Sequence, residues 1–255
     1  MGIAENKKNH DPTAGAWRFE LKYRISYFEY YEIRSALVPY MKKDFFTLKE
    51  PGEKYLVRSL YYDTYDYKAY DEKMSGDCDR IKFRLRTYSD TYSDDVKVRA
   101  ELKVRRGNAM EKFTAFVKGS DYSYFMQNGL WNVKNPVLDE YARYVYMREL
   151  KPQILIQYFR EGFEERARGG LRITFDHNVQ SIQSDTLFPE KNVFLRHHMP
   201  HTVILEIKCR NERPQWLRNL VRDHGLKIIA NSKFTQGIQA SRHDLYHPDG
   251  VVLVR

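Results

Sequence analysis

Residues 80–86 read Arg-Ile-Lys-Phe-Arg-Leu-Arg, so that every second residue is basic and every residue between is apolar. This period of two is that of a β-strand, whose successive side chains point to opposite faces of a sheet. One face of the strand would therefore carry Arg80, Lys82, Arg84 and Arg86. Neighbouring cations repel one another, so this face requires either open water or an anionic ligand.

The same alternation recurs elsewhere in the chain. It is found in residues 19–24 (FELKYR), 100–105 (AELKVR), 171–176 (LRITFD) and 205–210 (LEIKCR). A lone strand of this kind is most simply a solvated strand of an antiparallel sheet. Several such strands in one sheet would instead gather many cations and a few carboxylates on one surface. Closure of that sheet into a barrel would turn the surface into a lumen, which suits a polyphosphate bound through a divalent metal ion.

Composition indicates an anionic partner and a reducing compartment. The 255 residues carry a formal net charge of +9, which favours nucleic acid, anionic lipid or a phosphorylated small molecule. The charge is spread over strands rather than held in one run, which disfavours a disordered nucleic-acid-binding arm. Cys78 and Cys209 lie far apart and form no metal or redox motif. Because no stretch approaches the ~20 apolar residues of a membrane span and no signal peptide is evident, a cytoplasmic location is predicted.

The pattern predicts one α+β domain, an antiparallel β-barrel with a charged lumen that several helices wrap. Residues 1–16 are expected to be a disordered leader, 17–246 the domain and 247–255 a tail. Strands are predicted at 18–26, 55–63, 80–88, 96–105, 112–117, 153–160, 171–176 and 202–210, with a looser segment at 180–201. Helices are predicted at 27–43, 120–128, 137–150 and 214–224, with a short helix or turn at 65–74 and Gly225 as a helix cap. Residues 227–238 are expected to form a final strand or turn.

The order of the charged motifs is similar to that of a known family. These motifs are Glu20-Leu21-Lys22-Tyr23, Arg84-Leu85-Arg86, Glu101-Leu102-Lys103, Lys112-Phe113, Tyr158-Phe159-Arg160, Arg172-Ile173-Thr174-Phe175-Asp176, Glu206-Ile207-Lys208 and Ser232-Lys233-Phe234. As an ordered set they resemble the VTC (vacuolar transporter chaperone) domain, the polyphosphate polymerase branch of the CYTH-like triphosphate tunnel metalloenzymes. The resemblance extends over roughly residues 18–238.

The resemblance implies a strand-lined tunnel in which the terminal phosphoryl group of ATP passes to a growing polyphosphate chain, assisted by a divalent metal ion (Mn²⁺ or Mg²⁺). It implies catalytic roles for Arg84, Arg86, Lys103, Arg160 and Lys233, and substrate binding by Lys22, Lys112, Tyr158, Arg172, Lys208 and Ser232. Glu206 and Glu20 would hold the metal ion. The implied partners are ATP and polyphosphate rather than nucleic acid, and a membrane-associated partner protein is compatible with the family.

Two positions depart from the patterns of related proteins. Cyclases and triphosphatases of the wider CYTH group open with Glu-x-Glu-x-Lys, whereas Arg18, Glu20 and Lys22 occupy these positions here. The loss of one carboxylate argues against hydrolysis by a metal-activated water and toward the polymerase branch. Ala230 stands where polymerases often carry a second lysine, three residues before Lys233, which predicts weaker affinity or turnover.

Three functions therefore remain in view: a polymerase, a tunnel-fold triphosphatase acting on inorganic or thiamine triphosphate, and a non-catalytic sensor of polyphosphate or inositol phosphates. A general nucleic-acid binder ranks fourth, and it would require an exposed basic face. Individual residues also have simpler explanations. Glu101 and Glu20 are as easily salt-bridge partners as ligands. Further cations fit the alternation and are expected at a tunnel mouth or beside an acid, namely Arg58, Lys82, Arg105 and Arg210. The histidines lie mainly in loop-like stretches without the spacing of zinc ligands.

Overall fold

The computed structural model describes residues 19–107, 109–166, 170–190, 192–210 and 212–241. The predicted leader, the predicted tail and Arg18 lie outside these residues. Within them, no helix combines the length and the apolar character needed to cross a lipid bilayer.

The described chain contains both strands and helices. The strands are β1 (Phe19–Ser26), β2 (Met41–Lys43), β3 (Tyr55–Asp63), β4 (Arg80–Thr87), β5 (Val98–Arg106), β6 (Ala109–Val117), β7 (Lys151–Glu165), β8 (Leu171–Gln183), β9 (Arg196–His197) and β10 (Thr202–Cys209). The helices are α1 (Tyr27–Leu37), α2 (Phe45–Lys49), α3 (Lys68–Met74), α4 (Gly119–Asn128), α5 (Pro136–Met147), α6 (Gln215–Asp223) and α7 (Lys233–Ser241). The predicted α+β class is confirmed.

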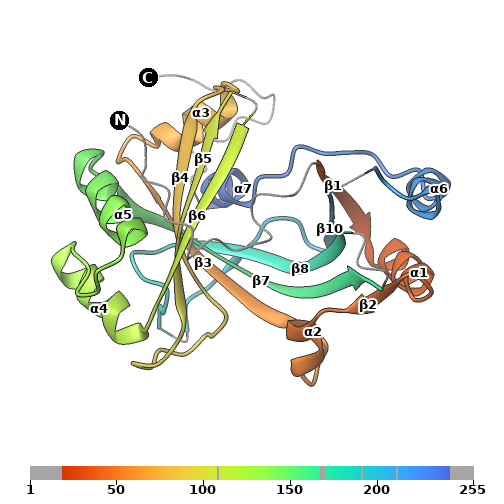
Figure 1. Cartoon of the computed structure of the whole chain (residues 1–255), viewed down its shortest axis with the longest axis horizontal. Helices are drawn as coiled ribbons and strands as arrows, with labels where there is room; N and C mark the ends of the chain where they lie inside the picture. The colour runs from red at the N-terminus through yellow and green to blue at the C-terminus, as the bar shows by residue number, and fades with distance from the viewer. Residues whose placement is uncertain (1–18, 108, 167–169, 191, 211, 242–255) are drawn as a thin grey trace.

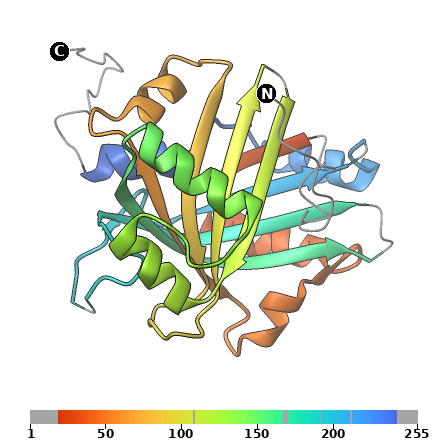
Figure 2. The ribbon, with the colours of Figure 1, turned by 60° about the vertical axis from the view of Figure 1, so that its left-hand side comes forward.

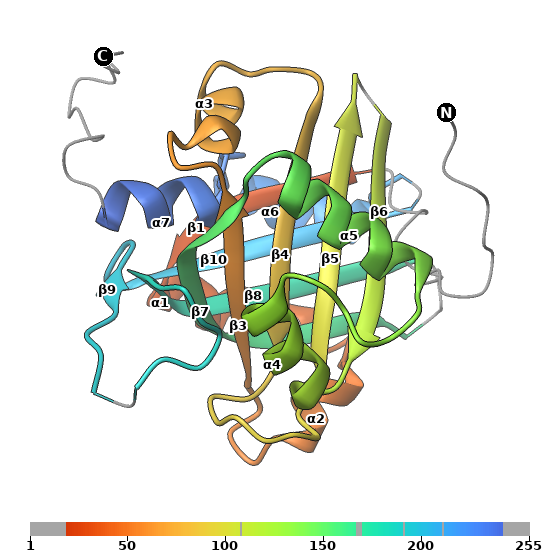
Figure 3. The same ribbon diagram turned by 90° about the vertical axis from the view of Figure 1, so that its left-hand side faces the viewer.

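One antiparallel sheet contains all the described strands. Its main order is β1-β10-β8-β7-β3-β4-β5-β6, with β2 added to β7 and β9 added to β8. The sheet bends sharply where β7 meets β3, so that it forms two halves. Figure 3 shows the upright half, β3 to β6, crossing in front of the nearly horizontal half, β1, β10, β8 and β7. The two halves face each other across an interior.

The predicted closure into a barrel is not observed. Among the described residues, the end strands β1 and β6 do not pair with each other. Instead, the segment before α7 lies along the outer edge of β1, where Tyr23 forms an isolated bridge with Ile228 and the Ile229 N–H donates to the Lys22 carbonyl over 2.9 Å. This contact satisfies edge groups that a neighbouring strand would otherwise pair. The interior is therefore wrapped by the sheet but open between its two ends.

The alternation in residues 80–86 sorts side chains between two environments. Phe83 and Leu85 on β4 are buried on the outward face, in a cluster that also contains residues of α4 and α5. Figure 2 shows these two helices lying across the upright strands. The intervening cations of β4 point into the interior. Each apolar side chain thus stabilises the sheet–helix contact by about 1.5–3 kcal/mol, while the basic residues are left for the inner surface.

The opposite half is covered by α1 and α6. Tyr30, Ile33 and Leu37 form the buried side of α1, as their spacing predicts, and Leu217 is buried on α6. The predicted helix over 27–43 is too long, because α1 ends at Leu37 and residues 41–43 form β2. Gly225 follows α6 with a φ of 57°, a left-handed conformation that glycine adopts without strain, and the predicted cap is confirmed.

The last element is a helix rather than the predicted strand or turn. In α7, Phe234 and Ile238 are buried together with Ile154, Ile156 and Tyr158 of β7. Gly237 fits closely against this strand, because a Cβ there would lie 3.1 Å from Ile154. The helix therefore covers the apolar part of the inner face and places its first residues beside the polar part. The short sequence over 227–238 did not reveal this role, because helical spacing is hard to recognise over so few residues.

Candidate active site in the basic interior

The inward-facing side chains come from strands in both halves of the sheet. All the predicted site residues lie on these faces or at the start of α7: Glu20 and Lys22 on β1, Glu206 and Lys208 on β10, Arg172 on β8, Tyr158 and Arg160 on β7, Arg84 and Arg86 on β4, Lys103 on β5, Lys112 on β6, and Ser232 and Lys233 at α7. Register explains the grouping, since residues of one parity share a face across every pair of strands. The functional roles of these residues remain predictions.

The first cluster of ion pairs surrounds Glu101 in the upright half. The Lys112 Nζ lies 2.5 Å from Glu101 Oε1, and Arg84 Nε pairs with the other carboxylate oxygen. Arg86 Nε lies 3.9 Å from the same carboxylate and donates to Ser59 Oγ over 2.9 Å. Burial alone would raise the pKa of Glu101, but Arg84, Arg86 and Lys112 outweigh it and hold the pKa well below its usual range. Glu101 is thus an ion-pair partner.

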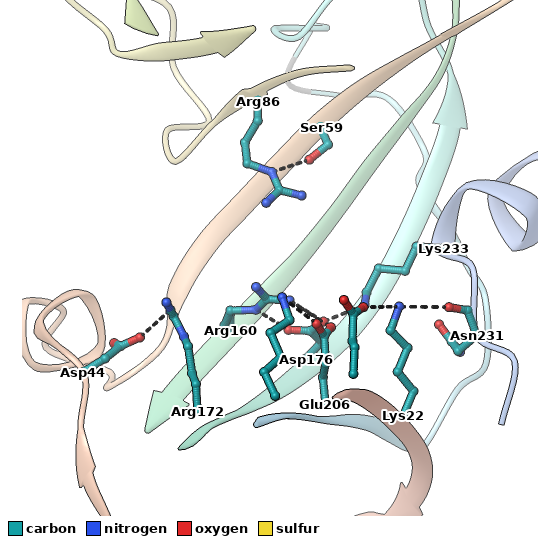
Figure 4. Close-up of polar contacts among 12 residues, drawn as sticks. Lys22, Asp44, Ser59, Arg86, Arg160, Arg172, Asp176, Glu206, Asn231 and Lys233 are labelled. Atoms are coloured by element: carbon teal, nitrogen blue, oxygen red, sulfur yellow. Dashed lines mark hydrogen bonds and ion pairs between the residues drawn. The ribbon is translucent and has the colours of Figure 1, made fainter. Parts of the chain in front are cut away.

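The second cluster surrounds Asp176 and Glu206 in the opposite half (Figure 4). Arg160 binds Asp176 through two hydrogen bonds, of 2.6 Å from Nε and 2.9 Å from NH2, and Lys233 Nζ lies 2.5 Å from Asp176 Oδ2. Lys208 Nζ lies 2.9 Å from Glu206 Oε1. Burial would raise the pKa of Asp176, but Arg160 and Lys233 lower it to about 2. Asp176 therefore carries a full negative charge at neutral pH.

Glu20 and Lys22 extend this second cluster onto β1. Lys22 Nζ lies 3.1 Å from Glu20 Oε1 and donates to the Asn231 carbonyl over 3.3 Å. Burial and the nearby Glu206 would raise the pKa of Glu20, yet Lys22, Lys208 and Lys103 lower it. Burial would also raise the pKa of Glu206, but Lys208 and Lys22 hold it well below its usual range, so both carboxylates are ionised. The register places Glu20 and Glu206 diagonally across β1 and β10.

The chemistry of these carboxylates fits a divalent metal ion that is held jointly with a ligand. Ionised carboxylate oxygens are the donors that Mg²⁺ and Mn²⁺ prefer. Within the described ranges, no group of three or more His, Cys, Asp or Glu residues is arranged to hold a metal ion by itself. Glu206 and Glu20 would thus supply some of the ligands of the metal ion. The remaining coordination positions would be left for phosphate oxygens and water.

Tyr158 and Ser232 support the cations by different means. The Tyr158 ring lies 5.2 Å from the Arg160 guanidinium carbon and 4.8 Å from Lys233 Nζ. These cation–π contacts hold both charges at the inner surface. The Ser232 hydroxyl accepts from the Thr235 N–H over 3.3 Å, as a helix N-cap does. Ser232 consequently orients the start of α7, and with it Lys233.

Arg172 stands apart from the central clusters. Its NH2 donates over 2.9 Å to Asp44 Oδ2, which Figure 4 shows to one side of the Asp176 group. Asp44 also begins α2, where its Oδ1 accepts from the Thr47 N–H over 2.8 Å. Gly162 allows this approach, because a Cβ there would meet Asp44 Oδ2 at 2.1 Å. The structure therefore ties Arg172 to α2 rather than to the other predicted substrate-binding cations.

Two of the further cations predicted from the alternation, Arg58 and Lys82, lie on opposite faces of the sheet. Arg58 does not face the interior: its guanidinium donates to Gln157 and to the carbonyls of Asp90 and Leu187. Lys82 faces inward, with Nζ 4.9 Å from the Phe234 ring. Alternation alone could not separate these two residues, because the facing of a strand depends on its partners in the sheet.

Three interior residues were not among the predicted site residues. Asp176 is fully buried, Asn231 bonds Lys22, and Tyr61 accepts from Arg84 NH1 over 3.0 Å. Burial would raise the pKa of Tyr61, but Arg84, Arg86 and Lys82 outweigh it and lower the pKa to about 8. The alternating positions of Asp176 and Tyr61 were a usable signal, whereas Asn231 lies outside any strand.

Comparison with known proteins assigns the chain to a family. A family model of the VTC domain matches residues 17–242. The chain belongs to the VTC domain family. The predicted resemblance is thereby confirmed, and this VTC domain carries its charged motifs on the inner faces described above. A search of curated proteins finds no significant match.

Solved structures are similar to this chain at low sequence identity. A Bacillus halodurans protein, provisionally assigned as an adenylate cyclase, matches with a TM-score of 0.51 and 11% identity over 84% of this chain and 92% of its own. A Vibrio parahaemolyticus protein with the same provisional assignment has a TM-score of 0.46 and 13% identity over 87% of this chain and 98% of its own. A Pyrococcus horikoshii protein has a TM-score of 0.42 and 10% identity over 87% and 99%. The first of these similarities shows that the domain shares its fold with that protein.

Proposed function

We propose that this VTC domain is an ATP-dependent polyphosphate polymerase. The observation that carries the proposal is the convergence of cations from opposite halves of one sheet on the same interior, in a chain of this family. Arg84 and Arg86 come from the upright half, and Arg160 and Lys233 from the other half and α7. Such an interior suits several consecutive phosphates, because each cation can contact a different phosphate.

The reaction requires alignment and charge stabilisation more than covalent work by the protein. An oxygen of the terminal phosphate of the chain attacks the γ-phosphorus of ATP. The new P–O bond lengthens the chain by one phosphate, while the bond from the γ-phosphorus to the bridging oxygen breaks and ADP leaves with that oxygen. Arg84 and Arg86 offer planar, bidentate contacts to the transferring group, and Lys233 offers a mobile point charge.

The two halves of the interior would have different roles in the reaction. Arg160, held by Asp176 and supported by the Tyr158 ring, is pre-oriented and loses little freedom when it contacts phosphate. Lys22 and Lys208 now pair with Glu20 and Glu206, and would turn toward phosphate oxygens when a ligand enters. Glu206 and Glu20 would hold a divalent ion, which supplies additional charge neutralisation at the phosphates.

Phosphorus NMR of the purified protein tests the proposal. The protein is incubated with ATP and Mn²⁺ for hours, and the ion is removed by chelation before spectra are taken. We expect signals of internal chain phosphates to grow as ADP appears. Release of orthophosphate alone would replace the proposal with a triphosphatase, and binding of ATP or polyphosphate without turnover would replace it with a sensor.

Substitutions in the interior test the site itself. Arg84→Ala or Arg86→Ala should lower turnover by about 10²–10³-fold, because each removes a charged donor from the transferring group. Lys118→Ala is the matched control, since Lys118 is exposed and pairs with Asp95 outside the interior. Full turnover in both arginine variants would overturn the assignment of the site.

A further inference from the structure

Tyr61 on β3 places a hydroxyl inside the candidate active site. In the register of β3 and β4 it stands opposite Arg84. Its ring contacts the ring of Phe234 on α7, with the two centroids 5.4 Å apart. Its oxygen accepts a hydrogen bond from Arg84 NH1 over 3.0 Å. The Tyr61 oxygen is therefore held directly on one of the two arginines that we assign to the transferring phosphoryl group.

Three cations act on this hydroxyl. Burial would raise its pKa, but Arg84, Arg86 and Lys82 outweigh burial and lower the pKa to about 8. At pH 7 the phenolate would thus be present in about a tenth of the molecules, far more than for an ordinary tyrosine. An oxygen nucleophile is weak while it is protonated, and a lowered pKa is one of the ways in which a protein activates it.

Two other inward-facing hydroxyls show that this combination is not general. Ser59 accepts from Arg86 Nε over 2.9 Å, but an alkyl hydroxyl stays protonated at neutral pH unless a general base removes its proton. Tyr55 lies opposite Arg160 in the register of β3 and β7, yet burial raises its pKa, so that its phenol stays protonated. Tyr61 combines contact with a candidate phosphate-binding cation and a lowered pKa, and Tyr55 is its matched control.

Arg84 can hold the Tyr61 oxygen and a phosphate at the same time. It donates from Nε to Glu101 and from NH1 to Tyr61. A guanidinium has five N–H donors, so further donors remain for a phosphate oxygen. ATP bound through its γ-phosphate at Arg84 and Arg86 would therefore lie beside the Tyr61 oxygen. Holding two reactants side by side in this way is what phosphoryl transfer chiefly requires.

We propose that Tyr61 is a phosphoryl acceptor, which becomes phosphorylated when ATP occupies an interior that holds no polyphosphate chain. The phenol first loses its proton to solvent. The phenolate oxygen then attacks the γ-phosphorus and forms a P–O bond, while the bond from that phosphorus to the bridging oxygen breaks and ADP leaves with that oxygen. The inference rests on the proposed binding of ATP at Arg84 and Arg86, and it does not require that a polymer be made.

Phosphotyrosine at this position would change the binding of further ligands. It adds a charge of about −1.5 to −2 at pH 7, beside Arg84, Arg86 and Lys82. A covalent phosphate would then neutralise the cations that a free phosphate ligand needs. We therefore expect the modified protein to bind inorganic tripolyphosphate at least about tenfold more weakly than the unmodified protein, as measured by calorimetric titration.

Mass spectrometry of the full chain tests the acceptor. The protein is incubated with ATP and Mn²⁺ without polyphosphate, sampled from the first turnovers onward, denatured and mapped by peptides. We expect one phosphoryl group on Tyr61 that survives acid, whereas phosphate on lysine, arginine or histidine is lost because its P–N bond hydrolyses. Labelling should become at least about tenfold faster from about pH 6.5 to 8.5, since the phenolate becomes the major form across a pKa of about 8.

Two conservative variants and a competitor locate the reaction. Tyr61→Phe should abolish the acid-stable label, while Tyr55→Phe, at the other interior tyrosine, should retain it. Both variants keep the aromatic ring, and circular dichroism checks that they fold. Polyphosphate added before ATP should suppress labelling of the parent protein, because the chain would occupy the same cations.

The outcomes separate the acceptor from the proposed polymerase. A label on Tyr61 in a protein that makes no polymer would support the acceptor and refute the polymerase. Polymer growth without a label on Tyr61, even in the first turnovers, would overturn the acceptor and leave the polymerase standing. An equal label in the Tyr61→Phe variant, or unchanged affinity for tripolyphosphate after modification, would also overturn the acceptor. If the variant does not fold, the peptide map and the pH dependence of the parent protein decide the question.

Discussion

Glu101 and Glu206 are both buried carboxylates in one interior, yet their surroundings differ. The partners of Glu101 come from its own half of the sheet, Arg84 and Arg86 on β4 and Lys112 on β6. Glu206 pairs with Lys208 on its own strand and with Arg160 on β7, and two other carboxylates, Glu20 and Asp176, lie near it. Glu101 is a counter-ion within one surface, whereas Glu206 belongs to a mixed cluster drawn from several elements.

The difference separates a structural carboxylate from a candidate ligand. A single carboxylate that is paired with three cations has no negative charge left for a metal ion. Separating it from these cations would destabilise the fold. Several carboxylates among mobile lysines retain negative charge that a divalent ion can use. The same residue type therefore has different proposed roles in the two halves, and substitutions should distinguish them.

The largest effect is expected for Glu101→Gln. Because the substitution leaves Arg84, Arg86 and Lys112 without their shared counter-charge, the free energy of unfolding should fall by about 3–5 kcal/mol. Urea denaturation measures this change. Glu111→Gln, at an exposed residue of β6, is the control and should stay within about 0.5 kcal/mol of the parent protein. Similar stability in both variants would refute the structural role of Glu101.

Glu206→Gln should act on metal use more than on stability. Glu20 and Asp176 continue to compensate the neighbouring cations, so the loss of stability should be smaller than for Glu101→Gln. Turnover should fall by about 100-fold, and half-saturation should require more Mn²⁺. The measurement is the dependence of activity on metal concentration in the two proteins. An unchanged metal requirement would remove Glu206 from its proposed role.

Tyr61→Phe should alter the pH dependence of stability in the upright half. The pKa of Tyr61 is about 8 in the fold, below its value of about 10 in an unfolded chain. Ionisation therefore stabilises the fold above pH 10, and this contribution is lost as pH falls through 8. Between pH 7.5 and 9.5 the parent protein should gain about 2 kcal/mol over the variant.

Urea denaturation at both pH values measures the gain. Lys82 titrates over the same range, since burial lowers its pKa to about 8, but it is present in both proteins. Because Tyr61 and Lys82 shift each other's pKa, the difference between parent and variant reports on the pair. A constant difference from pH 7.5 to 9.5 would mean that the arginines do not stabilise the tyrosinate.

The smallest effect is expected for Asp44→Asn, at the edge of the mixed cluster. Asparagine keeps an oxygen that can accept from the Thr47 N–H, so α2 retains its cap, while the ion pair with Arg172 is lost. The free energy of unfolding should fall by about 0.5–1 kcal/mol, and turnover should change by less than about tenfold. Thermal denaturation and an activity assay together test this expectation. A loss of turnover as large as that of Arg84→Ala would place Arg172 among the central cations.

Alternation made much of the inner surface predictable. The period of two in residues 80–86 and in the similar segments placed Arg84, Lys103, Glu206 and the other strand residues on inward faces. In the same way, the helical spacing of apolar residues predicted which sides of α1 and α5 are buried. These are local properties, since side-chain direction along a strand or helix follows from backbone geometry alone.

Tertiary structure decided which charges meet. The sequence by itself determined the strand faces, the family and a basic interior. It did not reveal that Asp44 would hold Arg172, that Arg58 would bond Gln157 on the outside, or that α7 would bring Lys233 to Asp176. It also did not determine that the sheet would remain open between β1 and β6. Such contacts join residues distant along the chain, and they depend on how the sheet bends and on which edge each segment covers, which no local pattern encodes.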